Sequence, residues 1–127
     1  MTPQELRKRL ADLAASITRM ARPLLADPAA RDPATQLARA AASAAANYRA
    51  ATLARSHAEF TAKIGVALEE ADETVFWLEH LRQAELAPEA AIDAVLQESL
   101  EMAAILGASK RTCTRNARQN RAWPRKR

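Results

Sequence analysis

Few side chains of this sequence could take part in catalysis. The chain has two histidines and one cysteine, and none of them lies in a pattern that would complete a hydrolytic triad. A di-iron centre in a helical bundle needs Glu three residues before His, but Ala54 precedes His57 and Trp77 precedes His80 at that spacing. With only two glycines, a glycine-rich phosphate loop is also excluded. We therefore expect no enzyme, no bound metal and no cofactor.

The C-terminal segment has a clear chemistry toward polyanions. Residues 107–127 contain eight Lys or Arg and no Asp or Glu, so their net charge is +8. The segment has no apolar stripe and predicts a disordered or partly helical tail. Its cations and its tryptophan favour contact with RNA or DNA, the alternative being a merely solubilising terminus. The candidate nucleic-acid-binding residues are Lys110, Arg111, Arg115, Arg118, Arg121, Trp123, Arg125, Lys126 and Arg127.

The rest of the chain divides into a basic and an acidic part. Residues 1–55 contain nine Lys or Arg and four Asp or Glu, which gives +5, whereas residues 56–106 contain two and eleven, which gives −9. The acidic part has a cluster that could pair with arginines of the basic part, form a solvent-exposed face, or bind a cation or a basic partner. This cluster consists of Glu69, Glu70, Asp72, Glu73 and Glu79.

Four stretches of the chain place an apolar residue at every third or fourth position, the pattern of a helix that buries one face. The first begins at Thr2, whose hydroxyl can cap a helix with Pro3 at its first position, and it ends or kinks at Pro23. Residues 27–33 contain two Asp-Pro pairs and predict a loop. The second helix is expected to begin near Ala34.

Capping signals mark the other two helices. Ser56 and Glu59 form a capping-box pattern that predicts the start of the third helix, which runs to about Ala84 and is expected to be the longest. The fourth begins after Pro88 and ends at Gly107, a residue type that favours helix C-caps. Its predicted inward stripe is Ile92, Val95, Leu96, Leu100, Ala103 and Leu106.

Short connections between helices of similar length favour antiparallel neighbours. We therefore predict an all-α fold, an antiparallel up-down-up-down four-helix bundle over residues 1–106 followed by the basic tail at residues 107–127. No stretch approaches the roughly 20 apolar residues of a membrane-spanning helix. The single cysteine and the lack of a signal-peptide pattern indicate a soluble, cytoplasmic protein.

The second predicted helix has two faces of small side chains. One of them carries Ser43 and Asn47, which lie four residues apart and are expected to form an interhelical hydrogen bond that fixes the register. Its other members are Ala40, Ala50 and Ala54. Because a bundle helix needs only one buried face, this second face is expected to meet either another core helix or another subunit.

Residues 36–81 carry a resemblance to a known family. The residues concerned are the S-x-x-x-N of Ser43 and Asn47, the S-x-x-x-F of Ser56 and Phe60, and the E-x-x-x-E-x-x-x-W of Glu69, Glu73 and Trp77. In these positions the chain resembles the four-helix-bundle proteins encoded in intervening sequences of bacterial 23S rRNA genes. The resemblance implies a ring-like homopentamer. The family also includes accessory proteins that bind a reverse transcriptase in diversity-generating retroelements.

Two functions follow as hypotheses. The first is a non-catalytic oligomeric binding protein whose basic tails, multiplied by symmetry, contact RNA or DNA. The alternative is a protein-interaction scaffold or accessory subunit whose acidic third and fourth helices dock a basic partner such as a reverse transcriptase.

Overall fold

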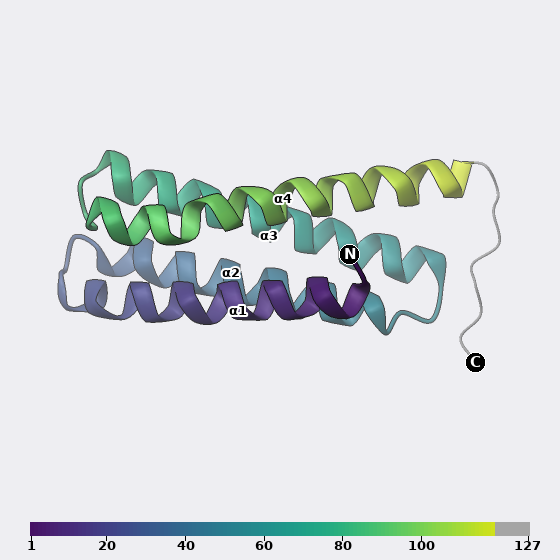
Figure 1. Cartoon of the computed structure of the whole chain (residues 1–127), viewed down its shortest axis with the longest axis horizontal. Coiled ribbons are helices and arrows are strands. Elements are labelled where there is room, and N and C mark those ends of the chain that lie inside the picture. Colours follow the sequence, from purple (N-terminus) through teal and green to yellow (C-terminus); the bar gives the residue numbers. More distant parts are fainter. Residues whose placement is uncertain (119–127) are drawn as a thin grey trace.

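The computed structural model describes residues 1–118, with side chains through Asn116. Within this range the chain contains four α-helices and no strand, which confirms the predicted all-α fold. The helices are α1 (Pro3–Ala21), α2 (Arg31–Thr52), α3 (His57–Gln83) and α4 (Glu89–Arg118), with a short 3-10 helix, η1 (Arg22–Ala26), after α1. Successive helices run in opposite directions along the long axis (Figure 1), consistent with the up-down-up-down prediction. Of the predicted tail residues, Arg121, Trp123, Arg125, Lys126 and Arg127 lie outside the described range.

Two predicted helix caps are confirmed. The Thr2 Oγ1 accepts a hydrogen bond of 3.1 Å from the backbone N–H of Glu5, and the Ser56 Oγ accepts one of 3.0 Å from the N–H of Glu59. Each hydroxyl satisfies a backbone donor that has no partner within its helix, a contribution of about 1 kcal/mol. The starts of α1 and α3 are therefore fixed by residues next to them in the sequence.

Proline affects the first connection in two ways. The helix α1 ends at Ala21, two residues before Pro23, and the chain continues as the 3-10 helix η1. This agrees with the prediction that the helix ends or kinks at the proline. The predicted loop at residues 27–33 is shorter than expected, because α2 begins at Arg31 rather than near Ala34. Pro33 is tolerated there because the N–H groups of a first helical turn have no intrahelical partner to lose.

The α3–α4 connection begins with a non-glycine residue in the left-handed region. Glu85 has a φ of 57°. The N–H of Leu86 donates to the Leu81 carbonyl at 2.9 Å, and the N–H of Glu85 donates to the Arg82 carbonyl at 3.1 Å. These two bonds form a Schellman motif, in which the left-handed position is usually glycine. The turn that sends α4 back along α3 therefore contains a strained glutamate.

The buried face of α4 differs from the predicted stripe. Ile92, Val95 and Leu106 are buried as expected, but Leu100 is 42% exposed, and Ser99 and Met102 occupy the core in its place. Ser99 is accommodated because its hydroxyl donates to the Val95 carbonyl at 2.8 Å. A polar residue therefore holds a core position, and the neighbouring leucine faces outward.

The predicted C-cap at Gly107 is wrong. The α4 helix continues through Gly107 to Arg118, so the predicted boundary between bundle and tail lies inside this helix. At 30 residues α4, rather than the 27-residue α3, is the longest element. The continuation has a packing reason, because Cys113 is only 7% exposed and so extends the buried face of α4 beyond Leu106.

The helices do not pack equally. The most extensive contact joins α2 to α3, and the least extensive joins α1 to α4. On the second small face of the predicted second helix, Ala40 and Ala54 are buried, whereas Ser43, Asn47 and Ala50 are half-buried. Among residues 1–118, no helix is both long and apolar enough to cross a membrane.

Ion pairs bridge the sparse contact between α1 and α4. The Arg9 guanidinium donates to both oxygens of Glu98, at 2.6 and 3.0 Å, and also lies 3.1 Å from Glu101. These hydrogen bonds, first of all the one to Glu98, raise the pKa of Arg9 above its usual value. The charge of Arg9 is therefore balanced by acidic residues within the bundle.

Candidate nucleic-acid interface

The basic C-terminal part of α4 is docked on the first turns of α3. The Lys110 Nζ donates to the Thr61 carbonyl at 3.3 Å, and the His57 Nε2 lies 3.1 Å from the Cys113 carbonyl, to which an Nε2–H can donate. Gly65 makes room for this contact, because a Cβ at that position would lie 2.9 Å from the Lys110 Nζ. The segment from Lys110 to Cys113 is thus part of the packed structure.

This docking separates the predicted nucleic-acid-binding residues into two kinds. Lys110 is half-buried and hydrogen-bonded to α3, so it positions the segment. Arg111 and Arg115 are exposed, lie four residues apart on one helical face, and form no ion pair or side-chain hydrogen bond with any residue up to Asn116. Arg118 is the last residue of α4, and the structure describes only its backbone.

The local electrostatics favour an anionic ligand beside Arg111 and Arg115. No Asp or Glu occurs in α4 after Glu101, so no neighbouring carboxylate on this helix competes for the two guanidiniums. On the opposite face, burial raises the pKa of the Cys113 thiol. The end of α4 therefore has a buried side that faces α3 and a cationic side that faces solvent.

The acidic cluster remains unpaired with the basic helices. Glu69 and Glu73 are exposed on α3, and in the part of the chain that the structure describes neither forms the expected ion pair with an arginine of α1 or α2. Arg9 instead pairs with α4, and Arg82 pairs with Glu89 and Asp93 near the α3–α4 turn. Between residues 1 and 118, no three His, Cys, Asp or Glu side chains gather as a metal site would require.

The other motif residues have structural positions. Asn47 donates to the carbonyl of Ser43 at 2.9 Å and to its hydroxyl at 3.1 Å, so the predicted interhelical hydrogen bond is wrong and the pair lies within α2. A half-buried amide can satisfy itself against the preceding turn without reaching another helix. Phe60 and Trp77 are partly buried against the core, and the Trp77 ring meets Phe76 edge to face, with 4.9 Å between centroids.

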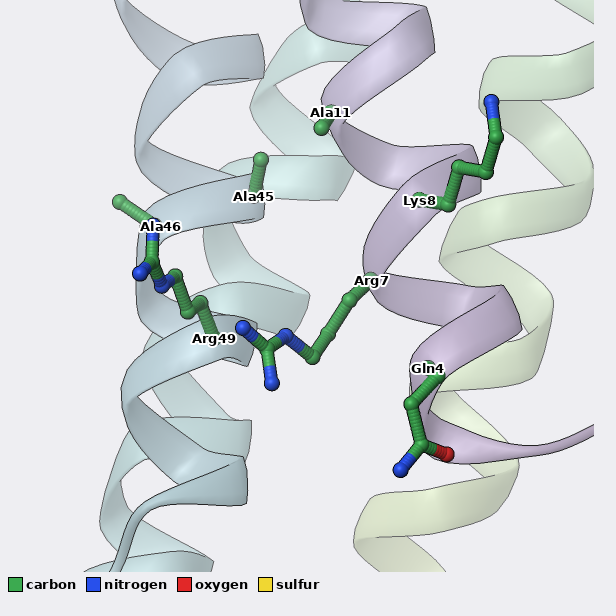
Figure 2. Close-up of a pocket in the computed structure, with 7 residues that line it drawn as sticks. All are labelled: Gln4, Arg7, Lys8, Ala11, Ala45, Ala46 and Arg49. Atoms are coloured by element: carbon green, nitrogen blue, oxygen red, sulfur yellow. The ribbon is translucent and has the colours of Figure 1, made fainter.

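A second basic surface, absent from the sequence predictions, lies between α1 and α2. It is an open groove of about 590 Å³ whose lining includes the small side chains of Ala11, Ala45 and Ala46. In Figure 2 the Arg7 side chain extends from α1 toward α2, whereas the Arg49 side chain runs along α2 toward Ala46. Gln4 and Lys8 complete the lining. The basic charge of residues 1–55 was visible in the sequence, but which arginines line the same groove depends on the rotation of each helix.

Comparisons with known proteins agree with this architecture. A family model described as "23S rRNA-intervening sequence protein" matches residues 4–108. A crystal structure of a protein with unknown function from the S23 ribosomal protein family of Bacteroides thetaiotaomicron is similar, with 27% identity and a TM-score of 0.79, over 87% of this chain and 99% of that one. A comparison with curated proteins finds no match. The family match ends two residues before Lys110, so it covers the bundle but not the basic side chains at the end of α4.

Proposed function

The chain belongs to the 23S rRNA-intervening sequence protein family, and from that premise we propose that it is a non-catalytic, cytoplasmic binding protein that contacts RNA or DNA through the C-terminal part of α4. One observation carries the proposal. Arg111 and Arg115 are exposed and free of acidic partners among the described residues, on a helix end that is held against α3. Two guanidiniums on a fixed helical face can contact successive phosphates without first ordering a flexible segment.

Oligomerisation would strengthen such contacts. By resemblance to its family we propose that the chain assembles as a homopentamer, which would present one copy of the Arg111 and Arg115 pair per subunit. Linked weak sites gain affinity because each later contact becomes intramolecular. Light scattering of the purified protein tests this part of the proposal, and a monomer would exclude the gain from symmetry.

The nucleic-acid contact is tested by removing the two exposed charges without shortening the helix. Truncation at Gly107 is unsuitable, since it would also delete the buried Cys113. In R111Q/R115Q, affinity for a labelled single-stranded RNA should fall about tenfold near 0.15 M salt, and the slope of log affinity against log salt should decrease by about 1.4, or ~0.7 per phosphate contact.

The matched control is R19Q/R39Q. It removes the same charge from exposed arginines of α1 and α2 that make no ion pair within residues 1–118. It should bind RNA as the unchanged protein does, apart from a small effect of net charge. Unchanged affinity in R111Q/R115Q, or equal losses in the two double variants, would contradict the assignment to α4.

A second candidate function rests on the acidic side of α3. Glu69 and Glu73 are exposed and unpaired within the described chain, and the nearby Phe76 is 55% exposed. An aromatic ring beside free carboxylates suits a basic protein partner, for which the family resemblance suggests a reverse transcriptase. If this is the function, E69K/E73K should lose co-purification with a co-expressed reverse transcriptase, whereas the control E85K, in the α3–α4 turn, should retain it.

A further inference from the structure

The cations at the start of α1 do not all have partners. Lys8 pairs with Asp12 at 2.7 Å, and Arg9 pairs with Glu98 and Glu101 across the α1–α4 contact. Arg7 lies on the side of α1 that lines the groove, and within residues 1–118 it forms no ion pair and no side-chain hydrogen bond. The Arg49 guanidinium on α2 likewise forms neither with these residues. Two of the cations that line the groove thus lack an anionic partner in the structure.

The setting of Arg7 and Arg49 makes an anion between them favourable. Both residues line the groove between α1 and α2, which the Arg7 side chain enters (Figure 2), and none of the residues lining the groove is acidic. Arg7 is half-buried and close to the buried phenol of Tyr48: burial raises the pKa of Tyr48 and the charge of Arg7 opposes that rise. A partly desolvated cation such as Arg7, in a groove with no acidic residue in its lining, is unfavourable unless a negative charge is bound.

We propose that this groove is a second phosphate-binding site, in which Arg7 and Arg49 together hold a phosphate of a nucleic-acid backbone. The identification of the ligand as nucleic acid rests on the proposed function, whereas the preference for phosphate rests on the groove itself. Guanidinium groups match phosphate oxygens with paired hydrogen bonds. The small alanine side chains in the lining leave space for a sugar-phosphate chain to approach the helices, and about 590 Å³ is within the range of ligand clefts, roughly 300–1,000 Å³.

The position of the groove also suits this ligand. Arg7 lies near the start of α1 and Arg49 near the end of α2, which place the groove toward the same end of the bundle as the C-terminal part of α4 (Figure 1). The acidic α3 cluster lies on neither of the two helices that line it. One strand of nucleic acid could therefore contact the groove and Arg111 with Arg115 from the same end of the molecule.

RNA binding by R7Q/R49Q tests the proposal, again with R19Q/R39Q as the control. Arg39 lines a separate hollow of about 260 Å³ between α1 and α2, toward the other end of the bundle, so the two variants differ in the location of the removed charge. We expect R7Q/R49Q to weaken binding of the labelled single-stranded RNA by about tenfold and to lower the salt slope by about 0.7, because one phosphate contact is lost. Equal affinity of R7Q/R49Q and R19Q/R39Q would overturn the proposal.

A second measurement separates this site from the α4 proposal. Pyrophosphate, added to the full chain, should shift the Nε–Hε NMR signals of Arg7 and Arg49 while leaving that of Arg19 in place, and R7Q should abolish the shift of Arg49. This result would support the groove even if R111Q/R115Q binds RNA normally. Unmoved Arg7 and Arg49 signals would refute it even if R111Q/R115Q loses RNA.

Two other results would assign the groove to something else. If R7Q/R49Q loses binding to phosphatidylserine vesicles but keeps its RNA affinity, the surface contacts membranes and the proposal fails. If light scattering shows that R7Q/R49Q has a different subunit number, the groove is a contact between copies of the chain, and the proposal fails as well.

Discussion

Gly107→Ala distinguishes a continuous α4 from a helix that stops at the glycine. No glycine among the described residues has a positive φ, and a Cβ at position 107 would meet the Arg111 Nη1 at 3.5 Å and the Leu68 Cδ1 at 3.9 Å, which are ordinary contacts. Alanine therefore fits without displacing a neighbour. Since glycine costs a helix interior about 0.8–1.0 kcal/mol relative to alanine, G107A should raise the free energy of unfolding by about 1 kcal/mol.

A C-cap at Gly107 would give the opposite sign. A left-handed glycine replaced by alanine loses about 1–2 kcal/mol, because its Cβ would clash with the following carbonyl. Urea unfolding followed by circular dichroism, at one protein concentration, measures the difference, and thermal unfolding should show a rise of about 4 °C. A lowered urea midpoint in G107A would refute a helix that continues to Arg118.

Three further substitutions test particular contacts. Gly65→Ala gains about 1 kcal/mol of helix propensity but displaces Lys110 from the Thr61 carbonyl. The free energy of global unfolding should therefore change little, while amide hydrogen exchange over residues 110–116 becomes faster. Unchanged exchange would contradict the docking of this segment on α3. Glu85→Gly should stabilise the chain by about 1 kcal/mol in urea unfolding, since glycine relieves the left-handed strain, and a loss of stability would rule out that strain. Met102→Ala removes a side chain that is 1% exposed and should cost about 2–5 kcal/mol, whereas a loss below about 1 kcal/mol would show that Met102 lies outside the core.

Local capping signals in the sequence predicted the starts of α1 and α3. The hydroxyls of Thr2 and Ser56 act on backbone groups only three residues away, so their effect depends little on the rest of the fold. The end of α4 could not be predicted in this way. Gly107 and the cations after it resemble a helix stop followed by a tail, but the contacts of Lys110 and Cys113 with α3 override that preference.

Helix rotation explains the remaining differences. Two overlapping apolar stripes run along α4, one through Leu96 and Leu100 and one through Ile92, Val95 and Met102, and only the packed structure shows that the second is buried. The groove was missed for the same reason, because the sequence alone does not show that Arg7 and Arg49 line the same space. The sequence did indicate Arg111 and Arg115 as candidate nucleic-acid-binding residues, because they lie in a segment without acidic residues.

The position of bound nucleic acid on the chain tests the proposed function most directly. A photoreactive single-stranded RNA, cross-linked to the full chain and located by mass spectrometry, should attach to the C-terminal part of α4 around Arg111 and Arg115 and to the groove near Arg7 and Arg49. Cross-links concentrated on α3 around Glu69 and Glu73, or none above those of a protein that does not bind RNA, would contradict the proposed interface.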